Sequence, residues 1–341
     1  MVMSHDITEL LDGVREAEKS DKNRRSLELW GENPDIGQDH WRGLPARGPG
    51  FPITIEPEVP MWSDILDFNV GRYYTDPEEY LRRTLQMDLY RFNEWQEDTC
   101  IEREISIWLG VSFEVSLFGV GTIYQDRVSP WISKEPVINC RDDLERMESP
   151  DFRSSGLMPR AHQFYEEIGE LLPEDFSVTF PDWGRSPFSV ATHLRGTEDF
   201  LVDMMQDPEF AHDQLRFITD CRKRWVEDRA DFLGTEVQPG NLYNDEVNGE
   251  LLPPRLYEEF ILPVELDLGE FQGIVYWHSC GVTTDFLSLI HRIPGLEMFH
   301  VGPWTDIERA AEEMGDLALE VCLDPVGDVQ RADDGRIDER M

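Results

Sequence analysis

The sequence predicts an α/β fold with parallel strands, of the (β/α)8 TIM-barrel type, preceded by an N-terminal extension. Segments of strand character alternate with segments of helix character from about residue 105 to residue 323, which is typical of parallel sheets. Polar side chains of catalytic type follow several of these strands, and in a barrel such strand ends meet at one mouth. These polar strand ends favour the barrel over a doubly wound sheet, and no Gly-rich phosphate loop follows any strand.

The extension is expected to cover residues 1–75 and the barrel residues 76–341. Residues 1–25 are charged and predict a short helix, whereas residues 31–60 are rich in Gly and Pro and predict an irregular arm or lid. Asp76-Pro77-Glu78-Glu79 then predicts a helix start, because Asp is a good N-cap, Pro fits the first helical position and acids suit the first turn.

The barrel elements follow from apolar periodicity and from helix-start signals such as Asp207-Pro208 and Asp306. Strands are expected over residues 105–118, 176–180, 236–238, 273–277, 296–301 and 317–323, and helices over 165–172, 197–205, 209–233, 254–270, 284–293 and 305–313.

The charge of the chain excludes one class of partner. Its 70 acidic and 31 basic residues give a formal net charge of −39, which would repel nucleic-acid phosphates. The acids are spread along the chain, and only four of the basic residues are lysines. A halophilic host explains the excess of acid, and a GC-rich genome explains the preference for Arg over Lys; the two interpretations are compatible.

The cellular location follows from what the sequence lacks. There is no apolar run of membrane-spanning length and no apolar signal-peptide centre near the N-terminus, so a cytoplasmic protein without membrane contact is expected. Its five cysteines are an odd number, which favours free thiols or metal ligands over a disulfide framework.

A metal site is indicated where Tyr276-Trp277 ends an apolar strand and His278-Ser279-Cys280 follows. Residues two apart on a strand point the same way, so His278 and Cys280 form half of a zinc site, and Cys322 offers a third ligand. Glu246 could supply another. The alternative is that His278 makes a hydrogen bond at the barrel rim and that Cys280 and Cys322 are packed residues.

A second group of candidates lies in the segment that follows residues 236–238. Asp245 and Glu246 are neighbours, so one would face the pocket as acid, base or ligand while the other anchors the loop. Asn241, Tyr243 and Asn244 add amide and phenol groups for catalysis or for polar parts of a substrate. The alternative is an ordinary solvated acidic loop with local hydrogen bonds.

Other strand ends supply candidate substrate-binding residues. Asp182 and Arg185 follow residues 176–180 and would either bind substrate charge or pair with each other. His300 lies near the end of residues 296–301, where it is either a substrate contact or a satisfied core histidine. His193 near a helix start is interpreted as a structural donor rather than a catalyst.

With these residues in view, the chain resembles the uroporphyrinogen decarboxylase superfamily over about residues 77–328. The resemblance is carried by Gly184-Arg185-Ser186-Pro187-Phe188, residues 252–263, His278-Ser279-Cys280-Gly281, Pro303-Trp304-Thr305-Asp306 and Leu323-Asp324-Pro325.

The resemblance implies a (β/α)8 barrel and one of two activities. True decarboxylases need no cofactor and hold substrate carboxylates with an N-terminal Arg-containing motif; here that region reads Arg24-Arg25-Ser26-Leu27 and does not match, although Ser63-Asp64-Ile65-Leu66 is similar to a decarboxylase segment with an essential Asp. The other branch transfers methyl groups between corrinoid proteins and thiols, with zinc on a His-x-Cys pair and a distant Cys, to which His278, Cys280 and Cys322 correspond.

We therefore expect a zinc-dependent methyltransferase. Its partners would be a corrinoid-binding protein and a small-molecule methyl donor or thiol acceptor, and it is compatible with a homodimer. The alternatives are a metal-free decarboxylase of the uroporphyrinogen type and a non-catalytic corrinoid- or tetrapyrrole-binding protein.

Overall fold

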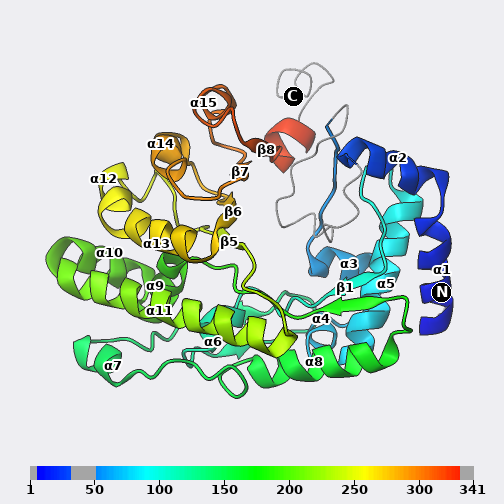
Figure 1. Cartoon of the computed structure of the whole chain (residues 1–341), viewed down its shortest axis with the longest axis horizontal. Coiled ribbons are helices and arrows are strands. Elements are labelled where there is room, and N and C mark those ends of the chain that lie inside the picture. The colour runs from blue at the N-terminus through cyan, green and yellow to red at the C-terminus, as the bar shows by residue number, and fades with distance from the viewer. Residues whose placement is uncertain (1–5, 32–50, 331–341) are drawn as a thin grey trace. The chain divides into compact units, whose positions relative to one another are not determined.

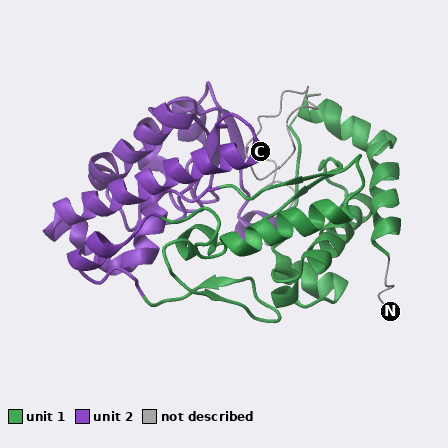
Figure 2. Cartoon of the chain, turned by 60° about the horizontal axis from the view of Figure 1, so that its bottom comes forward, with its two compact units in different colours: residues 1–41, 46–135, 150–182 green, residues 42–45, 136–149, 183–341 purple. Residues whose placement is uncertain are grey.

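The computed structural model describes residues 6–31 and 51–330. The chain divides into two compact units (Figure 2). Unit 1 comprises residues 1–41, 46–135 and 150–182, and unit 2 comprises residues 42–45, 136–149 and 183–341. Residues on both sides of position 75 belong to unit 1, so the boundary between extension and barrel stays a prediction. Much of the expected arm at residues 31–60 lies outside the described residues.

Unit 1 is mainly helical. Strands β1 (Glu104–Ser106) and β4 (Ser177–Thr179) pair in parallel, and the short strands β2 (Thr122–Ile123) and β3 (Trp131–Ile132) pair antiparallel. Its helices are α1 (Ile7–Glu18), α2 (Asp21–Trp30), α3 (Val59–Leu66), α4 (Val70–Tyr73), α5 (Pro77–Glu94), α6 (Phe113–Ser116) and α8 (Met158–Leu171).

Unit 2 is built on a four-stranded parallel sheet in the order β5-β6-β7-β8 (Figure 1). The strands are β5 (Gly240–Tyr243), β6 (Ile274–His278), β7 (Met298–Val301) and β8 (Ala318–Val321). The helical elements are α7 (Arg141–Arg146), α9 (Pro187–Arg195), α10 (Thr197–Gln206), α11 (Pro208–Leu233), α12 (Pro254–Leu256), the π-helical turn η2 (Tyr257–Ile261), α13 (Leu262–Gln272), the 3-10 turn η3 (Thr284–Phe286), α14 (Leu287–Ile290), α15 (Ile307–Glu313) and the π-helical turn η4 (Pro325–Gln330).

Helix starts were the most reliable local predictions. The Asp76 side chain accepts a hydrogen bond from the backbone N–H of Glu79, and Asp207 caps α11 in the same way. Asp306 is the N-cap of α15 rather than a residue of its first turn. In each case a short acidic side chain satisfies a backbone N–H that has no partner within the helix.

Three element predictions were wrong. The described part of the single helix expected over residues 1–25 belongs to two helices, α1 and α2, because the Ser20 side chain accepts from the N–H of Asn23 and starts α2. Residues 105–118 contain a three-residue strand and the helical turn α6, since Gly110 at φ +91° turns the backbone. Residues 236–238 are not a strand. The ladder starts at Gly240, whose N–H bonds the Gly273 carbonyl, so Asn241 and Tyr243 lie in β5 itself.

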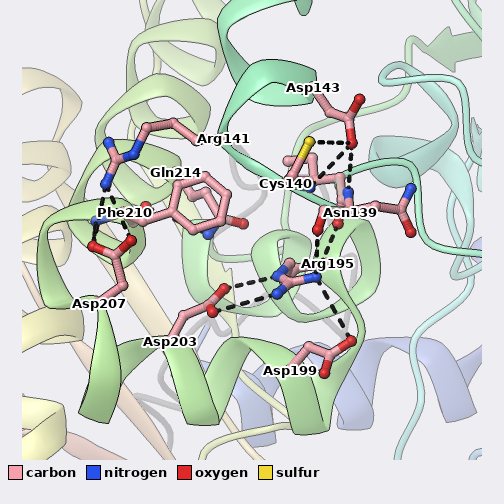
Figure 3. A network of polar contacts seen from close by, with 11 residues as sticks. Asn139, Cys140, Arg141, Asp143, Arg195, Asp199, Asp203, Asp207, Phe210 and Gln214 are labelled. Carbon is pink, nitrogen blue, oxygen red and sulfur yellow. Dashed lines mark hydrogen bonds and ion pairs between the residues drawn. The ribbon is translucent and has the colours of Figure 1, made fainter.

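The segment 136–149 belongs to unit 2 because side chains of α9, α10 and α11 hold it there (Figure 3). Arg195 of α9 donates to Asp203 at 2.7 Å and to the carbonyl of Asn139 at 3.2 Å. Arg141 of the segment reaches Asp213 at 2.6 Å. Ion pairs and hydrogen bonds therefore link elements that are more than 50 residues apart in the sequence.

Candidate functional site

The C-terminal ends of the four strands in unit 2 bring polar side chains into one row across the sheet. Tyr243 of β5 lies in register with His278 of β6, and His300 of β7 lies in register with Glu320 of β8. The rings of His278 and His300 have their centroids 4.1 Å apart, which joins the two halves of the row. One face of the sheet thus carries two imidazoles between a phenol and a carboxylate.

Asp245, His278 and Cys280 form the one group of three or more metal-competent residues found in residues 6–31 and 51–330. Their candidate ligand atoms all lie within 4.8 Å of one another. His278 Nε2 is 3.3 Å from Asp245 Oδ1 and 3.4 Å from Cys280 Sγ. The backbone N–H of Cys280 also donates to Asp245 Oδ1, at 3.3 Å, which holds the two loops together.

The electrostatics of this group suit a bound cation. Burial acts to raise the pKa of Asp245, but the hydrogen bond and charge of His278, with Arg185, outweigh it and hold that pKa well below its usual range. Burial and the neighbouring Asp245 charge raise the pKa of the Cys280 thiol to about 12. Without a cation the thiol therefore keeps its proton, whereas a metal ion at the same place would favour the thiolate.

The donor set fits zinc. Imidazole nitrogen, thiolate sulfur and carboxylate oxygen are all zinc ligands, and catalytic zinc sites combine three protein ligands with one open position. Although neighbouring atoms partly desolvate both groups, Asp245 and Cys280 keep exposed surface, so a further ligand can reach the group from solvent. His278 and Cys280 were expected in such a set; Asp245 was expected as an acid, base or ligand.

Cys322 is not part of this close group. It follows β8, where its N–H donates to the Val301 carbonyl at 3.0 Å, and its sulfur lies 3.7 Å from the Leu323 carbonyl oxygen. Cys322 is nevertheless close enough to be one of the groups that raise the pKa of the Cys280 thiol, after burial and Asp245. A ligand role for Cys322 stays a prediction.

Glu246 faces different partners from its neighbour Asp245. It accepts hydrogen bonds from the Ser189 hydroxyl, from Arg185 Nη1 at 3.2 Å and from His193 Nε2 at 2.9 Å. Burial acts to raise the pKa of Glu246, but His193 and Arg185 outweigh it and lower that pKa. Arg185 makes an ion pair with Glu246. The two roles considered for Asp182 and Arg185, binding of substrate charge and pairing with each other, stay predictions.

Asn244 lies in a buried polar layer between β5, β6 and α13. Its Nδ2 donates to Glu265 Oε1 at 2.8 Å, and Trp277 Nε1 and the Tyr257 hydroxyl donate to Glu265 Oε2. Tyr257 reaches this carboxylate from the π-helical turn η2. The contacts position the end of β5, so a direct catalytic role for Asn244 stays a prediction.

The two remaining candidates are also buried. The Asn241 carbonyl accepts from the fully buried Arg222 at 2.8 Å. His300 Nδ1 bonds the Ser279 carbonyl at 2.9 Å, and burial together with the charge of His278 lowers the pKa of His300 to about 3, so its ring is neutral. Substrate-binding roles for both residues stay predictions.

Sequence reasoning missed Glu320, Ser189 and Glu265 as partners of site residues. Glu320 could have been found from the sequence. It lies two positions before Cys322 in the predicted strand 317–323, so a regular strand places both side chains on the same face. Glu265 lies in the predicted helix 254–270, where nothing distinguishes it from other polar residues, and Ser189 lies in α9, a helix that was not predicted.

Position 281 requires glycine because another loop approaches its backbone closely. Its φ is not positive, but a Cβ there would lie 2.6 Å from the Val247 carbonyl oxygen. Gly281→Ala is therefore expected to push the β5 and β6 loops apart, to lower the free energy of unfolding by about 1–3 kcal/mol, and to weaken metal binding.

The measurements for Gly281→Ala are chemical unfolding and zinc affinity. Gly121→Ala is a matched control, since its Cβ would make an ordinary 3.6 Å contact with Ser133. Equal behaviour of the two variants would contradict the close-approach explanation.

The sequence matches the family model described as Uroporphyrinogen decarboxylase (URO-D) over residues 104–326. The chain belongs to the uroporphyrinogen decarboxylase family. Among solved structures it is similar to a methyltransferase from Methanosarcina mazei, with a TM-score of 0.57 and 14% sequence identity over 78% of this chain and 74% of that chain. A comparison with curated protein sequences gives no match.

Family membership and this likeness confirm the predicted TIM-barrel fold class. Strands β1 and β4 pair in parallel, and so do the neighbours in the sheet β5-β6-β7-β8. These described strands do not by themselves close into a ring. Within residues 6–31 and 51–330, every helix is too short or too polar to cross a membrane.

Proposed function

We propose that this family member is a zinc-dependent methyltransferase that moves a methyl group between a corrinoid protein and a thiol or methylated small molecule. The observation that carries the proposal is the close group of Asp245, His278 and Cys280 at the strand ends. The decarboxylase-type reaction expected of the other branch needs no such set. The similar fold of the Methanosarcina mazei methyltransferase adds support.

The proposed metal ligands are His278 Nε2, Cys280 Sγ and a carboxylate oxygen of Asp245, with Cys322 as a candidate fourth. Bound zinc would supply Lewis acidity, which favours the thiolate form of a substrate thiol at neutral pH. In the transfer, the thiol sulfur forms a bond to the methyl carbon, the electron pair of the carbon–cobalt bond stays on the partner's corrinoid, and the thiol proton is released.

The hydrogen-bonded pair of His193 and Glu246 is the proposed acceptor of that proton, with the imidazole as the base and the ionised Glu246 as the group that stabilises the charged ring. They share a 2.9 Å hydrogen bond, and Arg185, which pairs with Glu246, also acts on the charge of Asp245. Tyr243 is proposed to order the site, because its ring lies against His278 with centroids 5.3 Å apart. The ion pair of Arg185 with Glu246 leaves less of its charge for substrate carboxylates, which favours methyl transfer over decarboxylation of a polycarboxylate.

The proposal is tested by metal analysis and by a transfer assay on the purified protein. We expect one zinc per chain after extensive dialysis. We also expect zinc-dependent methylation of a small thiol with methylcobalamin as a surrogate donor, at low or at high salt because of the −39 charge. A protein that binds no zinc and transfers no methyl group under either condition would overturn the proposal.

The description of the family also favours a second candidate, a metal-free decarboxylase. Incubation with uroporphyrinogen, with and without a chelator, distinguishes the two. Decarboxylation that is unaffected by the chelator supports the second candidate, and absence of product removes it.

A further inference from the structure

Tyr276 and Glu320 form a chain of hydrogen bonds that ends on the candidate ligand His278. The Tyr276 hydroxyl is 3.1 Å from His278 Nδ1, and it also donates to Glu320 Oε2. Tyr276 and His278 are two residues apart on β6, so their side chains lie on the same face, and Glu320 reaches them from β8. These contacts lie on the side of the imidazole opposite the metal-competent Nε2.

The available hydrogens determine which group donates and which accepts in each of these hydrogen bonds. A carboxylate can only accept, so the single hydroxyl hydrogen of Tyr276 is committed to Glu320. The Tyr276 oxygen is then an acceptor for His278, which requires a proton on Nδ1. Without metal, Nε2 carries a proton that bonds Asp245 Oδ1. A metal ion at the group would take the place of that proton, and the neutral ring that binds it then carries its one N–H on Nδ1.

We propose that Tyr276 and Glu320 are positioning residues that hold His278 in the Nδ1–H tautomer, the form whose Nε2 can bind a metal. The inference rests on the proposed zinc site. It assigns to these two side chains the function that a carboxylate or carbonyl performs behind many metal-bound histidines, which is to fix the ring and raise its basicity.

Packing around the imidazole supports this assignment. Tyr276 is buried, with 2% of its surface exposed, and its ring lies edge-on to Tyr243 at a centroid distance of 5.8 Å. His278 lies between the rings of Tyr243 and His300, at 5.3 Å and 4.1 Å. With both faces covered, the ring cannot turn over easily. The hydrogen bond at Nδ1 therefore decides whether Nε2 can present a lone pair to a metal ion.

The test compares zinc affinity in Tyr276→Phe and Glu320→Gln by competition with a chromophoric chelator. We expect each variant to lose about 10–100-fold in affinity, and Glu320→Asp to recover part of the loss. Tyr73→Phe is the matched control, because it removes a buried hydroxyl that bonds Thr84 within unit 1. Its zinc affinity should equal that of the parent protein.

Nitrogen NMR of the metal-free protein, with labelled histidine, provides a second measurement. We expect Nδ1 of His278 to carry a proton in the parent protein, because the Tyr276 oxygen can only accept there. In Glu320→Gln the amide can donate to Tyr276, which allows the hydroxyl to donate to His278, so the population should move toward the Nε2–H tautomer. A purely structural role for Glu320 would not change the tautomer.

The outcomes separate this inference from the proposed function. If the parent protein binds no zinc, the proposed function fails, and the tautomer measurement still decides the inference. If the parent protein binds zinc and both variants bind it within about threefold of the parent, the inference is overturned. If Tyr276→Phe does not fold, Glu320→Gln and its NMR spectrum decide.

Discussion

His278→Ala is expected to abolish stable zinc binding and, with it, thiol methylation. Loss of a residue behind a metal ligand already costs about 10–100-fold in affinity, so loss of the ligand itself should cost at least about 100-fold. His278 is the member of the group that contacts both others, at 3.3 Å to Asp245 and 3.4 Å to Cys280. Zinc titration and the methyl-transfer rate measure the two effects.

His291→Ala is the matched control for that experiment. His291 pairs with Asp316 at 2.9 Å on the surface of unit 2, away from the strand-end row, so its removal should leave zinc affinity unchanged. Full zinc occupancy in His278→Ala would contradict the assigned site. Cys322→Ala belongs in the same series, because a loss as large as that of Cys280→Ala would identify Cys322 as the fourth ligand.

Glu265 is expected to make the stability of the protein fall as the pH rises. Burial raises the pKa of Glu265 from 4.5 to about 7, and the donors Tyr257, Asn244 and Trp277, with the charge of Arg222, offset only part of that effect. Because this pKa is higher in the folded than in the unfolded state, the contribution is fully present below about pH 4.5. It is lost as the pH rises through about 7.

The size of the effect follows from the shift. At about 1.4 kcal/mol per pKa unit, ionising Glu265 lowers the free energy of unfolding by up to about 3 kcal/mol. Glu265→Gln keeps the shape and cannot ionise, so the difference in stability between parent and variant should change by about this amount from pH 5 to pH 8. Urea unfolding at several pH values measures it.

Glu270→Gln provides the control, because Glu270 is an exposed carboxylate on the same helix, α13. Its difference from the parent protein should not change with pH over this range. Parallel stability curves for the parent protein and Glu265→Gln would show that Glu265 does not carry the pH dependence.

Much of the fold could be predicted from local signals. Asp207-Pro208 marked the start of α11, and alternating segments indicated the α/β class that family membership confirms. The prediction was wrong at residues 105–118, where Phe113 and Val115 are buried by a helical turn. A short apolar run has no periodicity that separates a buried strand from a buried helix.

The candidate site was partly predictable from local geometry. His278 and Cys280 are two residues apart at a strand end, and local geometry directs them together. The place of Asp245 beside them depends on parallel pairing of β5 with β6, which puts Tyr243 in register with His278. The sequence made Asp245 and Glu246 equal candidates for the acid, base or ligand of the site, and only their partners in the structure distinguish them.

The sequence by itself determined the fold class, the strongly acidic character and the His-x-Cys pair, since each depends on composition or on neighbours in the chain. The tertiary structure decided that Asp245 joins this pair, that Glu246 pairs with Arg185, and that Glu320 lies behind Tyr276. Those contacts join residues from about 30 to 60 positions apart. They depend on strand register and helix packing, which the whole chain sets together and no local pattern records.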